Sequence, residues 1–264
     1  MSVDGTTSRP RARYDISVLH KTLDVLESLA NGQPLTVVEC SQRTGISKTA
    51  AYRILGTLES RGYVYRDDSS RRFGIGVSLL ALGRSVLASA DLVGAARRAM
   101  RSLRDEFGET VNLGSLSLGR LVYLEMLESE RSLRTAVDVG SFDHVHSTAL
   151  GRAILAALPA EEARSILAGT ERVRVTARTR VKLDELIAEL ERTRRRGYSL
   201  DDEENEIGAR CVGVPIRDEH GRPVAALSIS GPAHRMRATV ISRLAVRLAS
   251  AAEEVEREIG VRHV

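Results

Sequence analysis

The sequence predicts an α+β protein of two domains: a small winged helix-turn-helix, then a larger domain with a mostly antiparallel sheet. Three observations predict this class. Residues 36–63 have the pattern of two short helices joined at a glycine. Two strand patterns follow at once around a polar turn, as expected of a wing. Beyond residue 91, helix and strand patterns recur, and a chain of 264 residues is long enough for two cores.

The composition fits a reduced, cytoplasmic protein. Hydrophobic residues make up 42% of the chain, and no apolar run approaches the ~20 residues that cross a bilayer. Residues 1–13 also lack an apolar run, so we expect neither a secretory signal nor membrane contact. Cys40 and Cys211 fall in different predicted domains, which argues against a disulfide framework.

The chain opens with a polar arm, residues 1–13, that we expect to be disordered. Its Arg9, Arg11 and Arg13 suit a DNA minor groove, although a loose solubilising tail is the simpler interpretation. Residues 16–29 then predict a supporting helix, stopped by Asn-Gly-Gln-Pro at 31–34. The apolar positions that mark this helix are Val18, Leu19, Leu23, Val25, Leu26 and Leu29.

The helix-turn-helix begins at Thr36, a good N-cap that Glu39 completes as a capping box. Gly45 supplies the backbone freedom that a tight turn between helices needs. Ser47 caps the second helix. The inward positions of this second helix are Ala50, Ala51, Ile54, Leu55 and Leu58.

The outward face of the second helix carries Lys48, Thr49, Tyr52 and Arg53, with no acidic residue before Glu59. A helix that is apolar behind and cationic and hydroxylic in front suits the DNA major groove. Residues 1–85 hold 12 Lys+Arg against 8 Asp+Glu, while the rest of the chain has 27 of each. The whole positive excess therefore lies where phosphate neutralisation would use it.

A hairpin wing follows the second helix, which Gly62 ends. Strands at 63–65 and 72–75 flank a polar turn at 67–70, and nearby arginines are placed to reach phosphates. The residues expected to contact DNA are Thr36, Arg43, Ser47, Lys48, Thr49, Tyr52, Arg53, Arg66, Arg71 and Arg72.

The stretch TGISKTAAYRILGTLESRGYVYRDDSSRRFGIGVSLLALG resembles the DNA-binding domain of the isocitrate-lyase-regulator (IclR) family of bacterial transcription factors. A later stretch, EENEIGARCVGVPIRDEHGRPVAALSISGP, is similar to the family's effector-domain signature, and together the matches span residues 17–259. One departure is Ser41, where the family more often has alanine. Serine is almost as small, and we expect its hydroxyl to bond back to the Val37 carbonyl.

Residues 77–90 predict a linker helix with little charge, which must pack on something. The resemblance implies that this helix contributes to dimer contacts, and packing within one chain is the alternative. We therefore expect a homodimer or a dimer of dimers.

Residues 91–264 predict an effector-binding domain, and the resemblance implies a GAF-like fold. Its expected strands are 111–113, 121–127, 133–139, 209–215 and 224–230, with a tight turn at Gly119-Arg120. Its expected helices are 91–108, 147–158, 161–168, 183–196 and a long terminal helix over 241–259.

Enzyme motifs are absent from the sequence, which has no GxSxG elbow, HExxH, Walker loop or GxGxxG after a strand. We therefore expect no catalysis and no cofactor. His144 and His146 lie beside Asp143, but no further residue has ligand spacing, so we expect no metal. The acidic run at 201–204 is either a solvated face or, in part, a pocket wall.

A ligand pocket is predicted where polar groups interrupt apolar strands. Ser228 and Ser230 share one face by the two-residue period, and Cys211 lies on the preceding strand. The helix start at 147–151 offers free N–H groups to an anion, so the ligand would be a small carboxylate. A serine pair satisfied by its neighbours is the structural alternative. The positions that the resemblance implies for the effector are Ala149, Leu150, Gly151, Asp201, Cys211, Ser228 and Ser230.

An aspartate would repel a carboxylate, so we expect Asp201 to accept from a ligand hydroxyl. The residues and the resemblance together predict a regulator of double-stranded operator DNA, a repressor of a catabolic operon controlled by a small organic acid. The alternative is a winged-helix module for protein contact, joined to a degenerate enzyme domain. Salt separates the two, because DNA binding weakens steeply with added salt.

Overall fold

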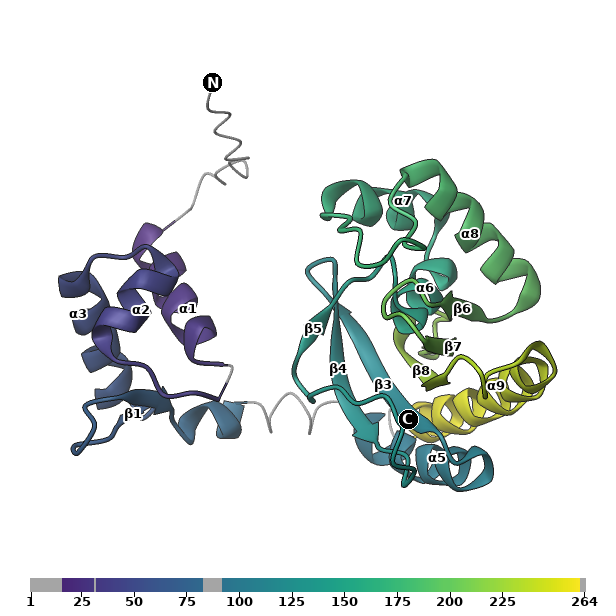
Figure 1. Cartoon of the computed structure of the whole chain (residues 1–264), viewed down its shortest axis with the longest axis horizontal. Helices are drawn as coiled ribbons and strands as arrows, with labels where there is room; N and C mark the ends of the chain where they lie inside the picture. The colour runs from purple at the N-terminus through teal and green to yellow at the C-terminus, as the bar shows by residue number, and fades with distance from the viewer. Residues whose placement is uncertain (1–15, 31, 83–91, 262–264) are drawn as a thin grey trace. The chain divides into compact units, whose positions relative to one another are not determined.

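The computed structural model describes residues 16–30, 32–82 and 92–261. The chain divides into two compact units, residues 1–89 and 90–264 (Figure 1). Residues 78–82 are helical. The predicted arm at 1–13 and the greater part of the predicted linker helix, from residue 83, lie outside the described residues.

The first unit is a winged helix-turn-helix, as predicted. Its helices are α1 (Ser17–Leu29), α2 (Val37–Thr44) and α3 (Lys48–Ser60), and its wing strands are β1 (Val64–Arg66) and β2 (Phe73–Ile75). The two strands pair antiparallel, with Tyr65 opposite Gly74. Leu29, Cys40, Leu55 and Phe73 join the three helices and the wing in one core.

The turn chemistry of the motif is largely as predicted. Thr36 and Glu39 form both halves of the capping box, with the Glu39 carboxylate accepting from the Thr36 N–H at 2.7 Å. Gly45 has φ of +69°, and the Ser47 hydroxyl accepts from the Ala50 N–H at 3.4 Å. The expected Ser41 bond is wrong. Its hydroxyl donates to the Ile46 carbonyl at 2.6 Å, because the Gly45 turn folds that carbonyl back over α2.

The N-terminal half of α1 differs from the prediction. Val25 and Leu29 are buried, but Val18, Leu19 and Leu23 are each more than half exposed, as is Ile16. From 16 to 24 only one residue is even partly buried, so this half of the helix projects beyond the core. These four exposed side chains, Ile16, Val18, Leu19 and Leu23, are called the α1 apolar surface below.

The described part of the second unit is built on a six-stranded antiparallel sheet in the order β5-β4-β3-β8-β7-β6. The strands are β3 (Thr110–Ser117), β4 (Arg120–Leu127), β5 (Phe142–Asp143), β6 (Ser199–Asp202), β7 (Ala209–Arg217) and β8 (Pro223–Pro232). The helices are α5 (Leu92–Phe107), α6 (Ala149–Ala157), α7 (Ala160–Gly169), α8 (Leu183–Arg196) and α9 (Ala238–Val261).

The sheet has helices on both faces. Helices α5 and α9 cover one face over a core that includes Leu113, Val212, Leu227 and Ile229, whereas α6, α7 and α8 lie on the other side (Figure 1). Because side chains alternate along a strand, the residues between these core positions face α6. That second face carries the polar side chains.

Two predictions for this unit are wrong in detail, and strand β6 was missed. Residues 133–139 do not form a strand, because side chains hold their backbone: Thr110 Oγ1 donates to the Thr135 carbonyl at 2.8 Å, and Arg235 to the Leu133 carbonyl at 2.8 Å. The tight turn is Leu118-Gly119, both with positive φ, and not Gly119-Arg120. The acidic run begins inside β6, an edge strand that the sequence did not suggest.

Candidate DNA-binding surface and effector site

The outward face of α3 is open, as predicted. Lys48, Thr49, Tyr52 and Arg53 are all exposed, while Ala51, Ile54, Leu55 and Leu58 are buried behind them. Among the described residues, neither Lys48 nor Arg53 has a side-chain partner. Ser47, also exposed, uses its hydroxyl oxygen to cap the helix.

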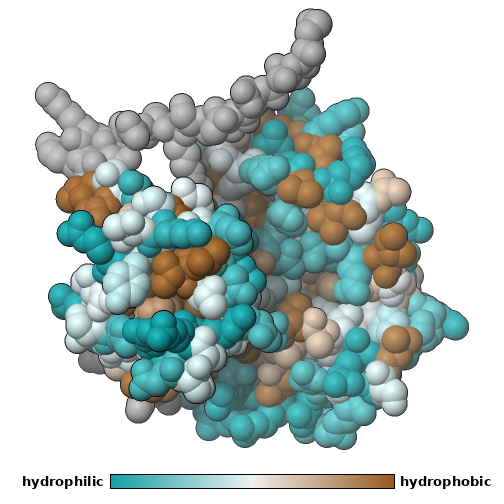
Figure 2. Space-filling model, turned by 60° about the vertical axis from the view of Figure 1, so that its left-hand side comes forward, coloured by the Kyte–Doolittle hydropathy of each residue, from teal (hydrophilic) through white to brown (hydrophobic). Residues whose placement is uncertain are grey.

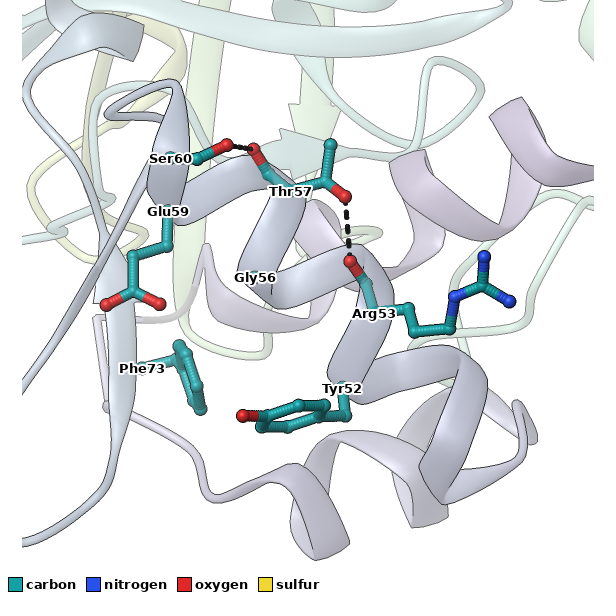
Figure 3. A pocket seen from close by; sticks show the side chains of 7 residues that line it. All are labelled: Tyr52, Arg53, Gly56, Thr57, Glu59, Ser60 and Phe73. Carbon is teal, nitrogen blue, oxygen red and sulfur yellow. Dashed lines mark hydrogen bonds between the residues drawn. The ribbon is translucent and has the colours of Figure 1, made fainter.

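A groove of about 350 Å³ lies between the second half of α3 and the wing (Figure 3). Phe73, only 2% exposed, contributes from the wing side. The Thr57 hydroxyl donates to the Arg53 carbonyl at 2.8 Å, and the Ser60 hydroxyl to the Thr57 carbonyl at 2.8 Å. The groove is lined by Tyr52, Arg53, Gly56, Thr57, Glu59, Ser60 and Phe73.

Two other predicted DNA contacts are engaged within the unit. The Thr36 hydroxyl belongs to the capping box, accepting from the Glu39 N–H at 3.2 Å. Arg43 is exposed and donates to the Ser28 carbonyl at 3.4 Å.

The three wing arginines have different surroundings. Arg71 is exposed and stands at the hairpin turn with φ of +53°. Arg66 lies over the Phe73 ring, 5.7 Å from its centroid. Arg72, expected to reach a phosphate, has its guanidinium bonded to both Glu39 oxygens at 2.9 and 3.2 Å. Arg72 therefore fixes the wing against α2.

Glu39 is ionised firmly in this arrangement. The Thr36 backbone N–H and hydroxyl, followed by Arg72, hold the pKa of the Glu39 carboxyl below its ordinary value. One carboxylate thus serves as helix cap and as wing anchor.

In the second unit, the register of the sheet brings four predicted effector residues together. Asp201 lies opposite Cys211, and Cys211 lies opposite Ser230. Ser228 follows on the same face by the two-residue period. Asp201, Ser228 and Ser230 are all buried.

Asn112 of β3 completes this row and was not anticipated from the sequence. It lies opposite Ser228, and its Nδ2 donates to Ser230 Oγ at 3.1 Å and to Ser228 Oγ at 3.5 Å. Its Oδ1 is buried without a partner among the described residues. We call Asn112, Asp201, Cys211, Ser228 and Ser230 the polar row.

The polar row carries little charge below about pH 6, and above that pH the Asp201 carboxylate is ionised. Burial raises the pKa of Asp201 to about 6, against two backbone N–H bonds from Glu204 and Asn205 that lower it. Burial, followed by the Asp201 charge, raises the pKa of the Cys211 thiol well above its ordinary value. Cys211 as a residue keeps some exposed surface, yet its thiol stays neutral.

The start of α6 packs directly on β7. Gly213 allows this, because a Cβ there would lie 2.9 Å from the Ala149 carbonyl oxygen. Thr148 caps the helix by accepting from the Gly151 N–H at 3.2 Å. The N–H groups of Ala149 and Leu150 have no partner among the described residues, so they are available to an anion.

A second hydrogen-bonded group joins β4 and β5 to Ser147, just before α6, and to Asn205, after β6. The Tyr123 hydroxyl donates to Asp143 at 3.1 Å, the Asn205 amide donates to Asp143 at 2.9 Å, and Ser147 donates to Asn205 at 2.6 Å. Burial and the Asp143 charge raise the pKa of Tyr123, so the phenol stays protonated. Asp143 and Ser147 lie in stretches that the sequence had singled out, but nothing in the sequence pairs them with Tyr123 or Asn205.

The acidic run is divided between the interior and the surface. Glu204 is buried against the guanidinium of Arg152, with contacts of 2.7 and 2.5 Å, and also bonds Arg180. Asp202 and Glu203 lie farther out and pair with Arg210 and Arg178. The run is therefore partly buried and partly at the surface.

The described residues contain no group of three side chains suited to a metal. His146 instead places Nε2 3.0 Å from the Val173 carbonyl oxygen. Across the described helices, none combines the length and apolar character needed to span a membrane.

Comparison with known proteins supports both units. Residues 18–68 match the IclR helix-turn-helix domain, and residues 84–257 match the C-terminal domain of the bacterial transcriptional regulator IclR. The HTH-type transcriptional regulator KdgR of Escherichia coli K12 is 33% identical over 245 residues, covering 93% of each chain.

Solved structures share the fold. The crystal structure of Thermotoga maritima IclR aligns with a TM-score of 0.72 at 34% identity, covering 93% of this chain and 100% of that one. An IclR homolog of Microbacterium hydrocarbonoxydans, complexed with 4-hydroxybenzoate, aligns with a TM-score of 0.79 at 24% identity, covering 92% and 98%.

These matches favour a regulator over the protein-contact module considered as the alternative. They span the helix-turn-helix and the effector domain in one continuous order. The chain belongs to the IclR family of bacterial transcriptional regulators, with an N-terminal DNA-binding helix-turn-helix and a C-terminal effector-binding domain.

Proposed function

We propose that the protein represses its target genes as a homodimer in the cytoplasm, and that a small hydroxy acid bound at the polar row controls its affinity for operator DNA. The observation that carries this proposal is the polar row itself, a line of buried polar side chains across four strands beside the start of α6.

The chemistry of the site selects an acid. The unpaired N–H groups of Ala149 and Leu150 favour a carboxylate, as helix N-termini do. The Ser228 and Ser230 oxygens already accept from Asn112, so their hydroxyl hydrogens can donate to the same ligand, that of Ser230 turning from the Cys211 thiol.

The remaining groups require a hydrogen-bond donor on the ligand. Asn112 Oδ1 is buried and unpaired, which costs free energy unless a ligand supplies a donor. The Asp201 carboxylate is also an acceptor above its pKa of about 6. A ligand with a carboxylate and at least one hydroxyl can bond both the donors at the start of α6 and the acceptors Asn112 and Asp201. A ligand with only a carboxylate can bond the donors alone.

DNA contact is assigned to the outward face of α3 and to Arg71 of the wing. The exposed cations Lys48, Arg53 and Arg71 suit base edges and phosphates. Arg72 is assigned a positioning role through Glu39.

Self-association is assigned to the α1 apolar surface together with the start of the linker, where Leu80 and Leu82 are more than half exposed. On the face of the first unit that Figure 2 shows, hydrophobic residues interrupt a mainly hydrophilic surface. Two α1 surfaces packed together would remove this apolar area from water. Effector binding would then shift the relative placement of the paired DNA-binding units.

The test is a ligand comparison on the full chain. Calorimetry with lactate against propionate, and with 4-hydroxybenzoate against benzoate, measures what the hydroxyl adds. We expect one hydroxy acid to bind at least ~10-fold more tightly than its partner, because an unmet buried acceptor costs about 1–3 kcal/mol. Equal affinity for both members of every pair would show that the ligand hydroxyl is not recognised. If none of the four acids binds, the proposal that the effector is a small acid is wrong.

A further inference from the structure

Gly56 occupies a position in α3 where folding does not require glycine. It lies in the interior of the helix, where glycine is less favourable than alanine. A Cβ built on Gly56 meets nothing within 4 Å, and its φ is not in the left-handed region. Alanine would therefore fit and stabilise the helix, and no contact among the described residues explains the missing side chain.

The surface around Gly56 is the groove between α3 and the wing. Gly56 follows Thr49, Tyr52 and Arg53 on the exposed face, by the three- and four-residue spacing of a helix. Figure 3 shows the Tyr52 and Glu59 side chains extending toward Phe73, and Arg53 extending away from them. Between these side chains the helix backbone at Gly56 is bare.

Dimensions indicate what enters the groove. Lys48 to Gly56 is about 12 Å of helix axis, at about 1.5 Å per residue. The B-DNA major groove is also about 12 Å wide, and a recognition helix enters it by its N-terminal residues. With Lys48 in the groove, Gly56 reaches the groove wall, which is a sugar–phosphate backbone.

We propose that the groove receives one strand of the operator, and that Gly56 is a positioning residue whose bare backbone accommodates a deoxyribose. This proposal rests on the DNA-binding function and concerns how the duplex is seated. The Tyr52 hydroxyl and the Arg53 guanidinium supply donors to the flanking phosphate. The Thr57 and Ser60 hydroxyl hydrogens are already given to the helix backbone.

Glu59 orients the strand within the groove. Its carboxylate has no partner among the described residues and repels phosphate. The phosphate therefore lies toward Tyr52 and Arg53, and the uncharged sugar lies over Gly56.

The experiment replaces Gly56 in the full chain by Ala and by Leu, with Gly260→Ala and Gly260→Leu in α9 as matched controls. Gly260 is also a helical glycine with nothing within 4 Å of an added Cβ. Two duplexes about four helical turns long serve as probes: one that the wild-type protein selects from a random pool, and one unselected.

We expect stability and DNA affinity to change in opposite directions. Gly56→Ala should slow amide hydrogen exchange in α3 by roughly two- to fivefold, since the helix is stabilised. It should weaken binding to both duplexes by about tenfold, and Gly56→Leu by about 100-fold, because a backbone contact carries no sequence information. Both Gly260 variants should bind as wild type does.

Wild-type affinity in both Gly56 variants would overturn the proposal. So would a loss confined to the selected duplex, which would place Gly56 against a base edge. If the wild-type protein selects no duplex from the pool, the DNA-binding function is itself contradicted, and so is the positioning role of Gly56.

Discussion

The recognition face of α3 and the polar row of the sheet use polar side chains in opposite ways. On α3, Lys48 and Arg53 are exposed and have no partner among the described residues. In the polar row, Ser228 and Ser230 are buried and bonded to Asn112, whose amide oxygen has no partner in the described part of the chain. A surface that reads a charged polymer is held open in water, where each contact is cheap to make and to break. The polar row is enclosed, so if it binds a small molecule as proposed, a single unmet atom is enough to discriminate between ligands.

The largest expected effect comes from breaking the buried Arg152–Glu204 ion pair of the effector unit. Glu204→Ala leaves Arg152, which is 1% exposed, buried without its carboxylate. We expect a loss of about 3–5 kcal/mol in the free energy of unfolding, measured by chemical denaturation and localised by hydrogen exchange. Arg222→Ala, which breaks the exposed pair with Glu162, is the control and should cost less than about 1 kcal/mol. Similar losses for both would show that burial of the pair is not what matters.

The second expected effect acts on the ligand and leaves the fold intact. Replacing Ser228 and Ser230 together by alanine removes two donors to an anionic ligand, each worth about 1.5–3 kcal/mol. Effector affinity should fall at least ~100-fold, while DNA binding without effector is retained. Calorimetry on the full chain, with whichever acid the wild type binds, measures the loss. Unchanged affinity would make the serine pair structural, satisfied by Asn112.

The third effect is a pH dependence confined to the effector unit. The pKa of Asp201 is raised from 3.8 to about 6, so the fold favours the protonated form. The stability contributed is fully present below pH of about 4 and is lost as pH rises through about 6, by up to ~3 kcal/mol. Asp201→Asn should flatten this part of the stability profile. If Asp201→Asn keeps the wild-type dependence of stability on pH, a group other than Asp201 takes up the proton.

The smallest effect sharpens the contrast within the first unit itself. Arg53→Ala should cost about 1–3 kcal/mol in DNA binding and leave thermal stability unchanged. Arg72→Ala, at a half-exposed pair, should instead lower thermal stability slightly through Glu39. Gel-shift titration and thermal unfolding of both variants give the comparison. If both alanine variants lose DNA affinity equally, Arg72 contacts DNA as Arg53 does.

The sequence predicted those elements whose ends are marked by local chemistry. The capping box at Thr36 and the Gly197 stop of α8, with φ of +82°, are written in adjacent residues, and the structure confirms both. The Ser41 bond was missed because its acceptor, Ile46, is brought near only by the turn. Local signals therefore fix boundaries, and contacts across a turn need the fold.

The effector site was predicted in part for a related reason. The two-residue spacing of Ser228 and Ser230 predicts that both lie on one face of their strand. Asn112 is a single polar residue on a different strand, so no spacing predicts its position. Residues 133–139 alternate like a strand, yet β5 takes the sheet edge beside β4. Strand β6 was missed because Ser-Leu-Asp-Asp has the composition of a surface loop, and only the sheet shows that Asp201 points inward. The spacing of residues predicts which of them share a face of a strand, but only strand pairing shows which residues of other strands lie beside them.

The shared carboxylate of Glu39 also bears on how an operator is chosen. Because Glu39 caps α2 and holds Arg72, it ties the wing to α2, and the shared core ties α2 to the recognition helix. A protein of fixed span makes the duplex adjust its own groove width and curvature. The cost of that adjustment depends on how stiff each base step is. Flexible pyrimidine–purine steps would then be favoured at base pairs that no side chain touches.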